Sequence, residues 1–306
     1  MIETQGLTKR FGDLTAVNSV TLGVGEGEVF GLLGPNGAGK TTTMRMLSCL
    51  VSKSEGMATV GGYDIGRASD AEKIRGLIGV LPESAGLYED LSARKNVEYY
   101  GKIHGVAQNR RDANIERLLK RLGLWDQRDT AVGSFSKGTK QKVAIARALV
   151  HDPKVVFLDE PTANLDPESS KTIRDVILEL KRDGRTVFFN THNLDEAQRV
   201  CDRVGIIKGR LLAVDSPARL GNLERHRRTA FQLERLDGDT VAAVKRARGG
   251  GVEARGDTLY VDVEDPLRDN PEIVQVLTKA GGRVVYVTDL SSGLEAAYLR
   301  LVGESR

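Results

Sequence analysis

The chain has 306 residues, of which 40% are hydrophobic and 28% charged, as expected for a soluble globular protein with room for one large and one small domain. The net charge of +3 is too small to indicate nucleic-acid binding, and residues 221–306 carry 13 basic against 14 acidic side chains. No apolar run approaches the length of a membrane span, and the N-terminus lacks the basic and apolar regions of a signal peptide.

The two cysteines indicate a reduced, cytoplasmic protein. Cys49 and Cys201 lie far apart in the sequence and outside any cluster with metal-ligand spacing. We therefore expect two ordinary small core residues and no metal site at either thiol.

The first elements that the sequence predicts are short β-strands. Residues 2–24 alternate loosely between apolar and polar side chains, which indicates antiparallel strands. A further short strand is expected over residues 57–65, around a Gly-Gly turn, and a buried strand over residues 78–81, ended by Pro82.

A glycine-rich loop with the pattern G-x-x-x-x-G-K-[ST] follows a strand predicted over residues 29–33 and precedes a helical pattern over 42–50. This strand–loop–helix context is typical of a phosphate-binding loop and makes a chance match on a surface loop a poor alternative. Backbone N–H groups would surround a polyphosphate at the positive end of the helix, Lys40 would reach the terminal phosphates, and the Thr41 hydroxyl would bind Mg²⁺. We call residues 34–42 the phosphate loop: Gly34, Pro35, Asn36, Gly37, Ala38, Gly39, Lys40, Thr41 and Thr42. The sequence thus predicts nucleoside triphosphate binding.

The middle of the chain predicts a helical insertion in a parallel α/β core. Between about residues 84 and 150, apolar side chains recur at i, i+3 and i+4. Apolar strands then return, separated by helical patterns, at residues 155–158, 186–189 and 204–207.

Two carboxylates end the strand predicted over residues 155–158. Asp159 at its tip would hold the Mg²⁺ of a nucleotide, usually through water, and Glu160 would act as general base on the attacking water. Acidic strand ends are common, but this one follows a phosphate loop by about 120 residues, which indicates the second half of a nucleotide-hydrolysing site.

The C-terminal part predicts a separate small domain. Residues 214–228 are expected to form a short helix and a linker. Strand, helix, hairpin, helix, strand and helix are then predicted over residues 229–236, 239–247, 252–263, 270–280, 283–288 and 291–302. The order βαββαβ plus a helix indicates a ferredoxin-like α+β sandwich.

The segment over residues 135–142 resembles the LSGGQ signature motif of ABC transporter ATP-binding subunits, and the resemblance covers residues 1 to about 220. It implies that the Ser136 side chain and the Gly138 backbone contact the ATP held by an opposite subunit, at the start of a helix. Lys137 and Thr139 replace the first Gly and the Gln of the motif. Such variants look like those in stand-alone ATPase subunits of exporters, so we expect a working site.

The same resemblance assigns roles to three further residues. Phe11 lies where the family stacks adenine, although a lone Phe is more often a core residue. Asp166 matches the loop that touches the partner subunit. His192 matches the switch histidine, which would hydrogen-bond the γ-phosphate and position Glu160 and the water.

A second departure from the family pattern is Glu83, where glutamine is usual. A carboxylate is a hard oxygen ligand that can bind Mg²⁺, and a solvated acid without contact to the metal is the alternative. Residues 85–88, with Leu91, offer apolar surface either for a docking helix of a membrane subunit or for ordinary core packing.

The expected fold class is α/β: a P-loop NTPase core with an antiparallel β subdomain and a helical insertion over residues 1–220, then the ferredoxin-like domain over 221–306. The resemblance implies two copies that sandwich two ATP molecules and open on hydrolysis. It also implies a separate membrane permease, which places the chain at the cytoplasmic face of the cell membrane. Similar C-terminal helices occur in drug- and glycolipid-efflux ATPases, which favours export of drugs, lipids or glycans; the cargo, the choice between homodimer and heterodimer, and the role of the C-terminal domain stay open.

A soluble ABC ATPase that acts on ribosomes or DNA is the alternative function. Translation-associated relatives carry two ATP-binding domains, whereas this chain has one phosphate loop. DNA-repair relatives split the domain with a long coiled coil, and no heptad run is present here. A small-molecule kinase would lack the signature motif with Asp166 and His192 in order. The sequence therefore favours a transporter ATPase without a nucleic-acid partner.

Overall fold

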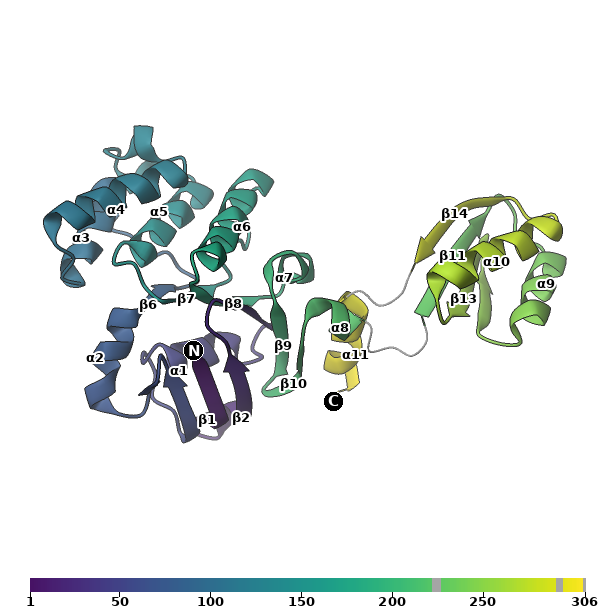
Figure 1. Cartoon of the computed structure of the whole chain (residues 1–306), viewed down its shortest axis with the longest axis horizontal. Helices are drawn as coiled ribbons and strands as arrows, with labels where there is room; N and C mark the ends of the chain where they lie inside the picture. The colour runs from purple at the N-terminus through teal and green to yellow at the C-terminus, as the bar shows by residue number, and fades with distance from the viewer. Residues whose placement is uncertain (222–226, 290–293, 305–306) are drawn as a thin grey trace. The chain divides into compact units, whose positions relative to one another are not determined.

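The computed structural model describes residues 1–221, 227–289 and 294–304. The described chain forms two compact units, one over Met1–Ser216 and one over Pro217–Glu304 (Figure 1).

The first unit contains an antiparallel sheet built from the N-terminal strands. Its strand order is β2-β1-β4-β5, with β1 (Ile2–Phe11), β2 (Leu14–Val24), β4 (Glu55–Val60) and β5 (Tyr63–Asp64). In β2, Val20, Leu22 and Val24 are buried while the residues between them are exposed, the alternation of a strand with one face on a core. The antiparallel strands predicted for residues 2–24 are confirmed. The segment predicted as one short strand over residues 57–65 forms β4 and β5 on the two sides of the predicted Gly-Gly turn.

The second sheet of this unit carries the site at one edge. Its order is β10-β9-β3-β8-β7-β6, from β3 (Val29–Leu33), β6 (Ile78–Leu81), β7 (Val155–Asp159), β8 (Thr186–Thr191), β9 (Arg203–Lys208) and β10 (Arg210–Asp215). All strands except β10 are parallel. Every residue of β3, β7 and β8 is buried, because helices cover both faces of a parallel sheet. The segments that follow these three neighbouring strands therefore leave the sheet at the same edge.

Helices join the strands of this core and form the insertion. They are α1 (Lys40–Leu47), α2 (Ala68–Leu77), α3 (Ala93–Ile103), α4 (Gln108–Arg121), α5 (Lys137–Leu149), α6 (Pro167–Arg182) and α7 (Leu194–Val200). Short 3₁₀ turns, Trp125–Gln127 and Val132–Ser134, lie between α4 and α5. The predicted helical insertion corresponds to α3, α4 and α5. The sequence analysis missed α2, because Ile74 is its one buried residue and no apolar periodicity marks it.

The second unit contains a four-stranded antiparallel sheet. Its order is β12-β13-β11-β14, from β11 (Arg227–Leu233), β12 (Val252–Arg255), β13 (Thr258–Val263) and β14 (Val284–Asp289). Helices α9 (Gly238–Arg248) and α10 (Pro266–Lys279) complete a βαββαβ order with a core of Phe231, Leu259, Val261, Ile273 and Leu277. The described start of α10 is Pro266 rather than residue 270, because Asp265 caps the helix and Pro occupies its first position.

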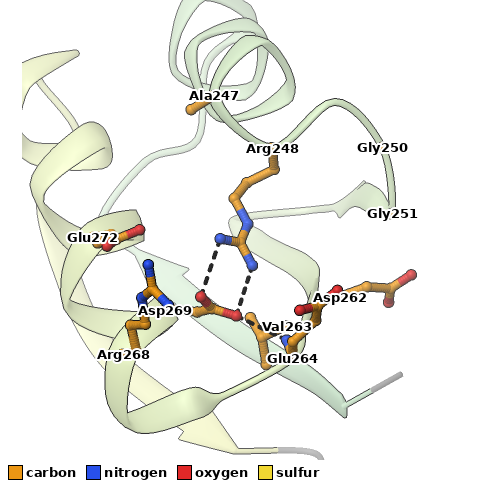
Figure 2. Close-up of a pocket in the computed structure, with 10 residues that line it drawn as sticks. All are labelled: Ala247, Arg248, Gly250, Gly251, Asp262, Val263, Glu264, Arg268, Asp269 and Glu272. Atoms are coloured by element: carbon orange, nitrogen blue, oxygen red, sulfur yellow. Dashed lines mark hydrogen bonds and ion pairs between the residues drawn. The ribbon is translucent and has the colours of Figure 1, made fainter. Parts of the chain in front are cut away.

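Two further helices belong to this unit. Helix α8 (Pro217–Gly221) packs against α11 (Leu294–Glu304). Residues 222–226 of the predicted linker and residues 291–293 of the predicted last helix lie outside the described residues. In the sandwich, Arg248 of α9 forms two hydrogen bonds to Asp269 of α10, at 2.8 and 3.2 Å (Figure 2). This ion pair joins the end of one helix to the first turns of the other.

No helix in the described ranges combines the length and the apolar character that crossing a bilayer requires. Cys49 and Cys201 are half-buried free thiols that pack against the two hydrophobic clusters of the first unit. Burial raises the pKa of both thiols, so they are uncharged and behave as small apolar groups.

Candidate nucleotide-binding and hydrolysis site

The phosphate loop connects β3 to α1, and its glycines permit close backbone approach. A Cβ at Gly34 would collide with the carbonyl oxygen of Ile207, and one at Gly39 would lie 2.5 Å from the carbonyl oxygen of Ala16. Gly39 also has φ of 96°, a conformation that L side chains rarely adopt. The loop backbone therefore lies against its neighbours in a form that side chains at these two positions would prevent.

Lys40, the first residue of α1, is 6% exposed. Its ammonium donates to the carbonyl oxygens of Gly34 at 2.7 Å and Pro35 at 3.2 Å. A cavity of about 300 Å³ adjoins it, lined by Ala16, Asn36, Gly37, Ala38, Gly39, Lys40, Thr41, Thr42, Glu83 and Glu160. The loop thus presents a buried positive charge and the N-terminus of α1 to one cavity, the chemistry of an anion site.

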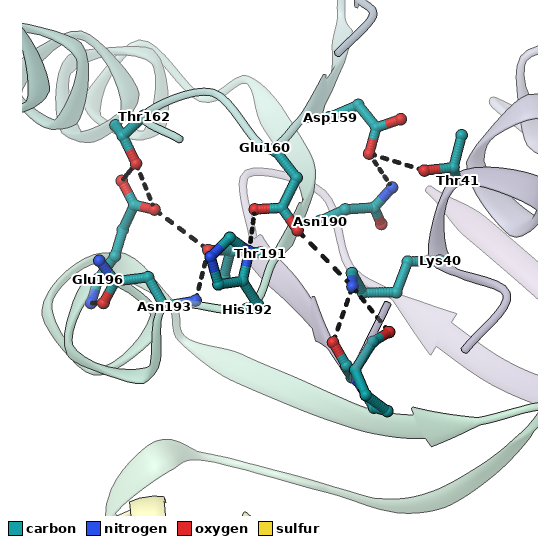
Figure 3. A network of polar contacts seen from close by, with 12 residues as sticks. Lys40, Thr41, Asp159, Glu160, Thr162, Asn190, Thr191, His192, Asn193 and Glu196 are labelled. Atoms are coloured by element: carbon teal, nitrogen blue, oxygen red, sulfur yellow. Dashed lines mark hydrogen bonds and ion pairs between the residues drawn. The ribbon is translucent and has the colours of Figure 1, made fainter. Parts of the chain in front are cut away.

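Asp159, at the end of β7, is held by two donors on one oxygen. Its Oδ1 accepts from the Thr41 hydroxyl at 3.1 Å and from the Asn190 amide at 2.9 Å (Figure 3). Asp159 is 2% exposed, so its carboxylate is oriented by these contacts rather than by water. Together with Glu83 on the cavity wall, Thr41 and Asp159 supply hard oxygen donors, which fit Mg²⁺.

Glu160 follows Asp159 and adopts a strained backbone with φ of 49°. Its N–H donates to the carbonyl oxygen of Asn190 at 3.0 Å, which fixes the turn after β7. Its Oε2 lies 2.8 Å from Nδ1 of His192, and its Oε1 lies 3.6 Å from Nζ of Lys40. The structure therefore brings together Lys40, Glu160 and His192 from three segments that follow neighbouring strands (Figure 3).

The signature motif lies at the start of α5, against the start of α6. Ser136 caps α5 and accepts from the Thr139 N–H at 3.2 Å. A Cβ at Gly138 would lie 2.5 Å from Oγ of Ser169 and 3.1 Å from Oδ2 of Asp166. The Asp166 side chain caps α6 by accepting a hydrogen bond from the Ser169 N–H. Hydrogen bonds from the backbone and side chain of Ser169 lower the pKa of the Asp166 carboxyl. Gly138 thus adjoins Asp166. Neither these two residues nor Ser136 line the cavity at the phosphate loop.

Phe11 ends β1 with its side chain exposed. It is 49% exposed, and Nζ of Lys9 lies 4.8 Å from the ring centroid. Phe11 is therefore not a core residue, which was the alternative to adenine stacking in the sequence analysis. In the apolar segment over residues 85–88, Ala85 and Leu87 pack against the core while Tyr88 is 48% exposed.

Asn190 is a site residue that the sequence analysis did not single out. It is fully buried in β8, opposite Asp159 of β7. The available signal was one amide directly after the apolar run of β8. Its importance follows only from the pairing of β8 with β7, and α6 separates these two strands in the sequence.

Known proteins resemble this chain in sequence and in fold. Residues 17–163 match the family model described as ABC transporter. The chain is 43% identical over 212 residues to the ABC transporter ATP-binding protein NatA of Bacillus subtilis (strain 168), a match that covers 68% of this chain and 85% of that protein. It is 35% identical to the daunorubicin resistance ATP-binding protein DrrA2 of Streptomyces coeruleorubidus, over 99% of this chain and 95% of that protein.

A solved structure supports the same relationship. The ATP-binding cassette MJ0796, determined as a dimer in a post-hydrolysis state with ADP and Pi, matches with a TM-score of 0.65 and 28% identity over 71% of this chain and 98% of that one. The likeness to DrrA2 extends along nearly the whole chain, and the phosphate loop, Glu160 and His192 meet in the described first unit. This chain therefore belongs to the ATP-binding subunits of ABC transporters.

Proposed function

We propose that this chain hydrolyses ATP as the energising subunit of a membrane exporter, with Glu160 as general base. The observation that carries the proposal is the contact of Glu160 with both His192 and Lys40, at 2.8 and 3.6 Å. A carboxylate between a histidine and the lysine of a phosphate loop lies where a γ-phosphate and its attacking water would meet.

ATP binding is assigned to the phosphate loop and its surroundings. Backbone N–H groups of residues 34–42 surround the phosphates, Lys40 neutralises their terminal charge, and Phe11 stacks on adenine. Mg²⁺ bound with ATP would offset charge on the phosphates, and Thr41, Asp159 and Glu83 would hold it, Asp159 through water.

Hydrolysis transfers the γ-phosphoryl group to water. The water oxygen bonds to the γ-phosphorus, the bond from that phosphorus to the β,γ-bridging oxygen breaks, and ADP leaves with the electron pair. Glu160 accepts the proton that the water loses. His192 holds the Glu160 carboxylate and donates to the γ-phosphate, and Lys40 stabilises the charge on the oxygens.

A second copy of the chain completes the site in this proposal. Its Ser136 and Gly138 would contact the γ-phosphate at the N-terminus of α5, beside Asp166. Because both copies contact the γ-phosphate, hydrolysis removes contacts that favour the closed dimer, and the pair opens.

The names of full-length relatives support export through a separate permease. DrrA2 is named for daunorubicin resistance, and a relative from Rhizobium sp. (strain N33) that is 35% identical over 99% of this chain is named for Nod factor export. We infer that this chain docks on a membrane-spanning subunit at the cytoplasmic face of the cell membrane.

Mild detergent extraction of native cells, purification through a tag on the full chain and mass spectrometry test this proposal. A multi-span membrane protein recovered in near-equal amount is the expected result. Ribosomal or DNA-repair proteins without a membrane protein would contradict it and would favour a soluble ATP-driven switch.

A further inference from the structure

A buried carboxylate lies beside the two segments that carry Glu160 and His192. Glu196, in the first turn of α7, is 1% exposed. Its two carboxylate oxygens lie 2.7 and 2.8 Å from the hydroxyl of Thr162, and one of them also lies 3.3 Å from the hydroxyl of Thr191 (Figure 3). Thr162 is two residues beyond Glu160, and Thr191 directly precedes His192.

The first turn of α7 fixes Glu196 against this loop. The Asn193 side chain caps the helix by accepting from the Glu196 N–H at 3.1 Å, and the Asn193 N–H donates to the Thr191 hydroxyl at 3.0 Å. Thr191, Asn193 and Glu196 therefore form one short hydrogen-bonded network from residues that flank His192 in the sequence. The Glu196 carboxylate extends that network to Thr162 on the other segment.

Burial of a carboxylate is unfavourable unless hydrogen bonds to it replace water. Here burial raises the pKa of Glu196, while the hydroxyls of Thr162 and Thr191 and the charge of Arg174 oppose the shift. A side chain placed here for packing alone would be apolar. The Glu196 carboxylate instead links the segment after β7 to the segment after β8. These two segments begin at Asp159 and Asn190, which are paired in the sheet.

We propose that Glu196 is a positioning residue that holds Glu160 and His192 in the mutual geometry required for hydrolysis. The inference rests on the proposed roles of those two residues. Glu196 contacts neither of them through any hydrogen bond in the described structure, and acts through Thr162 and Thr191. Small displacements of a catalytic base lower turnover more than they change nucleotide binding, which is made by the separate phosphate loop.

The test measures ATP hydrolysis by purified full-length variants. Glu196→Leu removes both acceptor oxygens, and Thr162→Val removes the hydroxyl with little change of volume. Each is expected to lower kcat about tenfold or more with KM for ATP changed less than about threefold. Glu196→Gln keeps one acceptor oxygen and adds a donor, so this variant should retain most of the turnover that Glu196→Leu loses.

The double variant and a matched control separate positioning from stability. Because Thr162 and Glu196 act as one contact, Thr162→Val combined with Glu196→Leu should lose little more turnover than either alone. Thr186→Val removes a fully buried hydroxyl at the other end of β8, where it bonds Gly25 and Gly27. It should lower thermal stability comparably and leave kcat unchanged.

Two results would overturn the inference. The first is an unchanged kcat in Thr162→Val together with an unchanged kcat in any folded Glu196 variant. The second is a loss of kcat in Thr186→Val as large as the loss in Thr162→Val. Glu160→Gln distinguishes this failure from failure of the proposed function. If Glu160→Gln abolishes turnover while Thr162→Val does not, the inference alone falls. If Glu160→Gln hydrolyses ATP at the normal rate, both fall.

Discussion

Nδ1 of His192 lies 2.8 Å from Oε2 of Glu160, although the two residues come from segments after different strands. The Glu160 side chain is 13% exposed and that of His192 is 58% exposed. The half-buried carboxylate is therefore held by a largely exposed imidazole on one oxygen and by the buried Lys40 on the other. This arrangement supports a base that is oriented before any water reaches it.

Replacement of the imidazole tests the contact directly. His192→Ala is expected to lower kcat about a hundredfold, because Glu160 loses its partner and the γ-phosphate loses a donor. Thermal stability should change little, since the His192 side chain is largely exposed. Steady-state ATPase assays and a melting curve of the full chain check both points. Turnover at the normal rate would exclude the assigned role.

Asn190 should control the metal requirement rather than ATP binding. Its amide is one of two donors that orient Asp159, so Asn190→Ala leaves that carboxylate with Thr41 alone. The Mg²⁺ concentration for half-maximal hydrolysis is expected to rise about tenfold, as is usual when a residue that orients a metal ligand is removed. The measurement is an Mg²⁺ titration of ATPase rate at saturating ATP. An unchanged midpoint would contradict the role.

Gly138 tests the signature helix, with Gly76 as its matched control. A Cβ at Gly138 meets Ser169 and Asp166, whereas a Cβ at Gly76 of α2 meets no atom within 4 Å. Gly138→Ala should therefore displace the start of α5 and lower hydrolysis more than about tenfold, with nucleotide affinity of the single chain unchanged. Gly76→Ala should leave the rate normal and stabilise the helix by about 0.5–1 kcal/mol. Equal rates in the two variants would argue against a site at this helix.

His151 makes stability depend on pH. Its ring stacks on His104 with centroids 3.7 Å apart, and burial together with His104 lowers the pKa of His151 to about 4. The unfolded chain, where a histidine titrates near its ordinary value of about 6.5, binds the proton first as pH falls. Stability should therefore decrease from about pH 6.5 towards pH 4, by roughly 1–2 kcal/mol between pH 7 and 5.

Urea unfolding of the full chain at pH 7 and pH 5 measures this dependence. His151→Gln lacks the titrating ring and should show a smaller loss between the two pH values. An equally steep loss in the variant would assign the pH dependence to other groups.

The sequence alone predicts the strands and motifs but not their cross-strand contacts. The apolar runs of β3 and β7 and the residues after them are local patterns, so the phosphate loop and Asp159 are recognisable from the residues themselves. His192 is recognisable only through the resemblance to the family and the order of its motifs. The pairing of Asn190 with Asp159 and of Glu196 with Thr162 depends on crossover connections, which no short window of sequence contains. Strand β10 was missed for a different reason: its residues are mostly half-exposed and lack the apolar run of the buried strands.

The most direct test of the central claim is the mass of the Glu160→Gln chain in solution by light scattering, with ATP and with ADP. If a second copy completes the site and Glu160 is the base, the variant should form a stable dimer with ATP and remain a single chain with ADP. The γ-phosphate of ATP joins the two copies, and the variant lacks the base needed to hydrolyse it. A single chain at saturating ATP, with ATP left intact, would contradict the account.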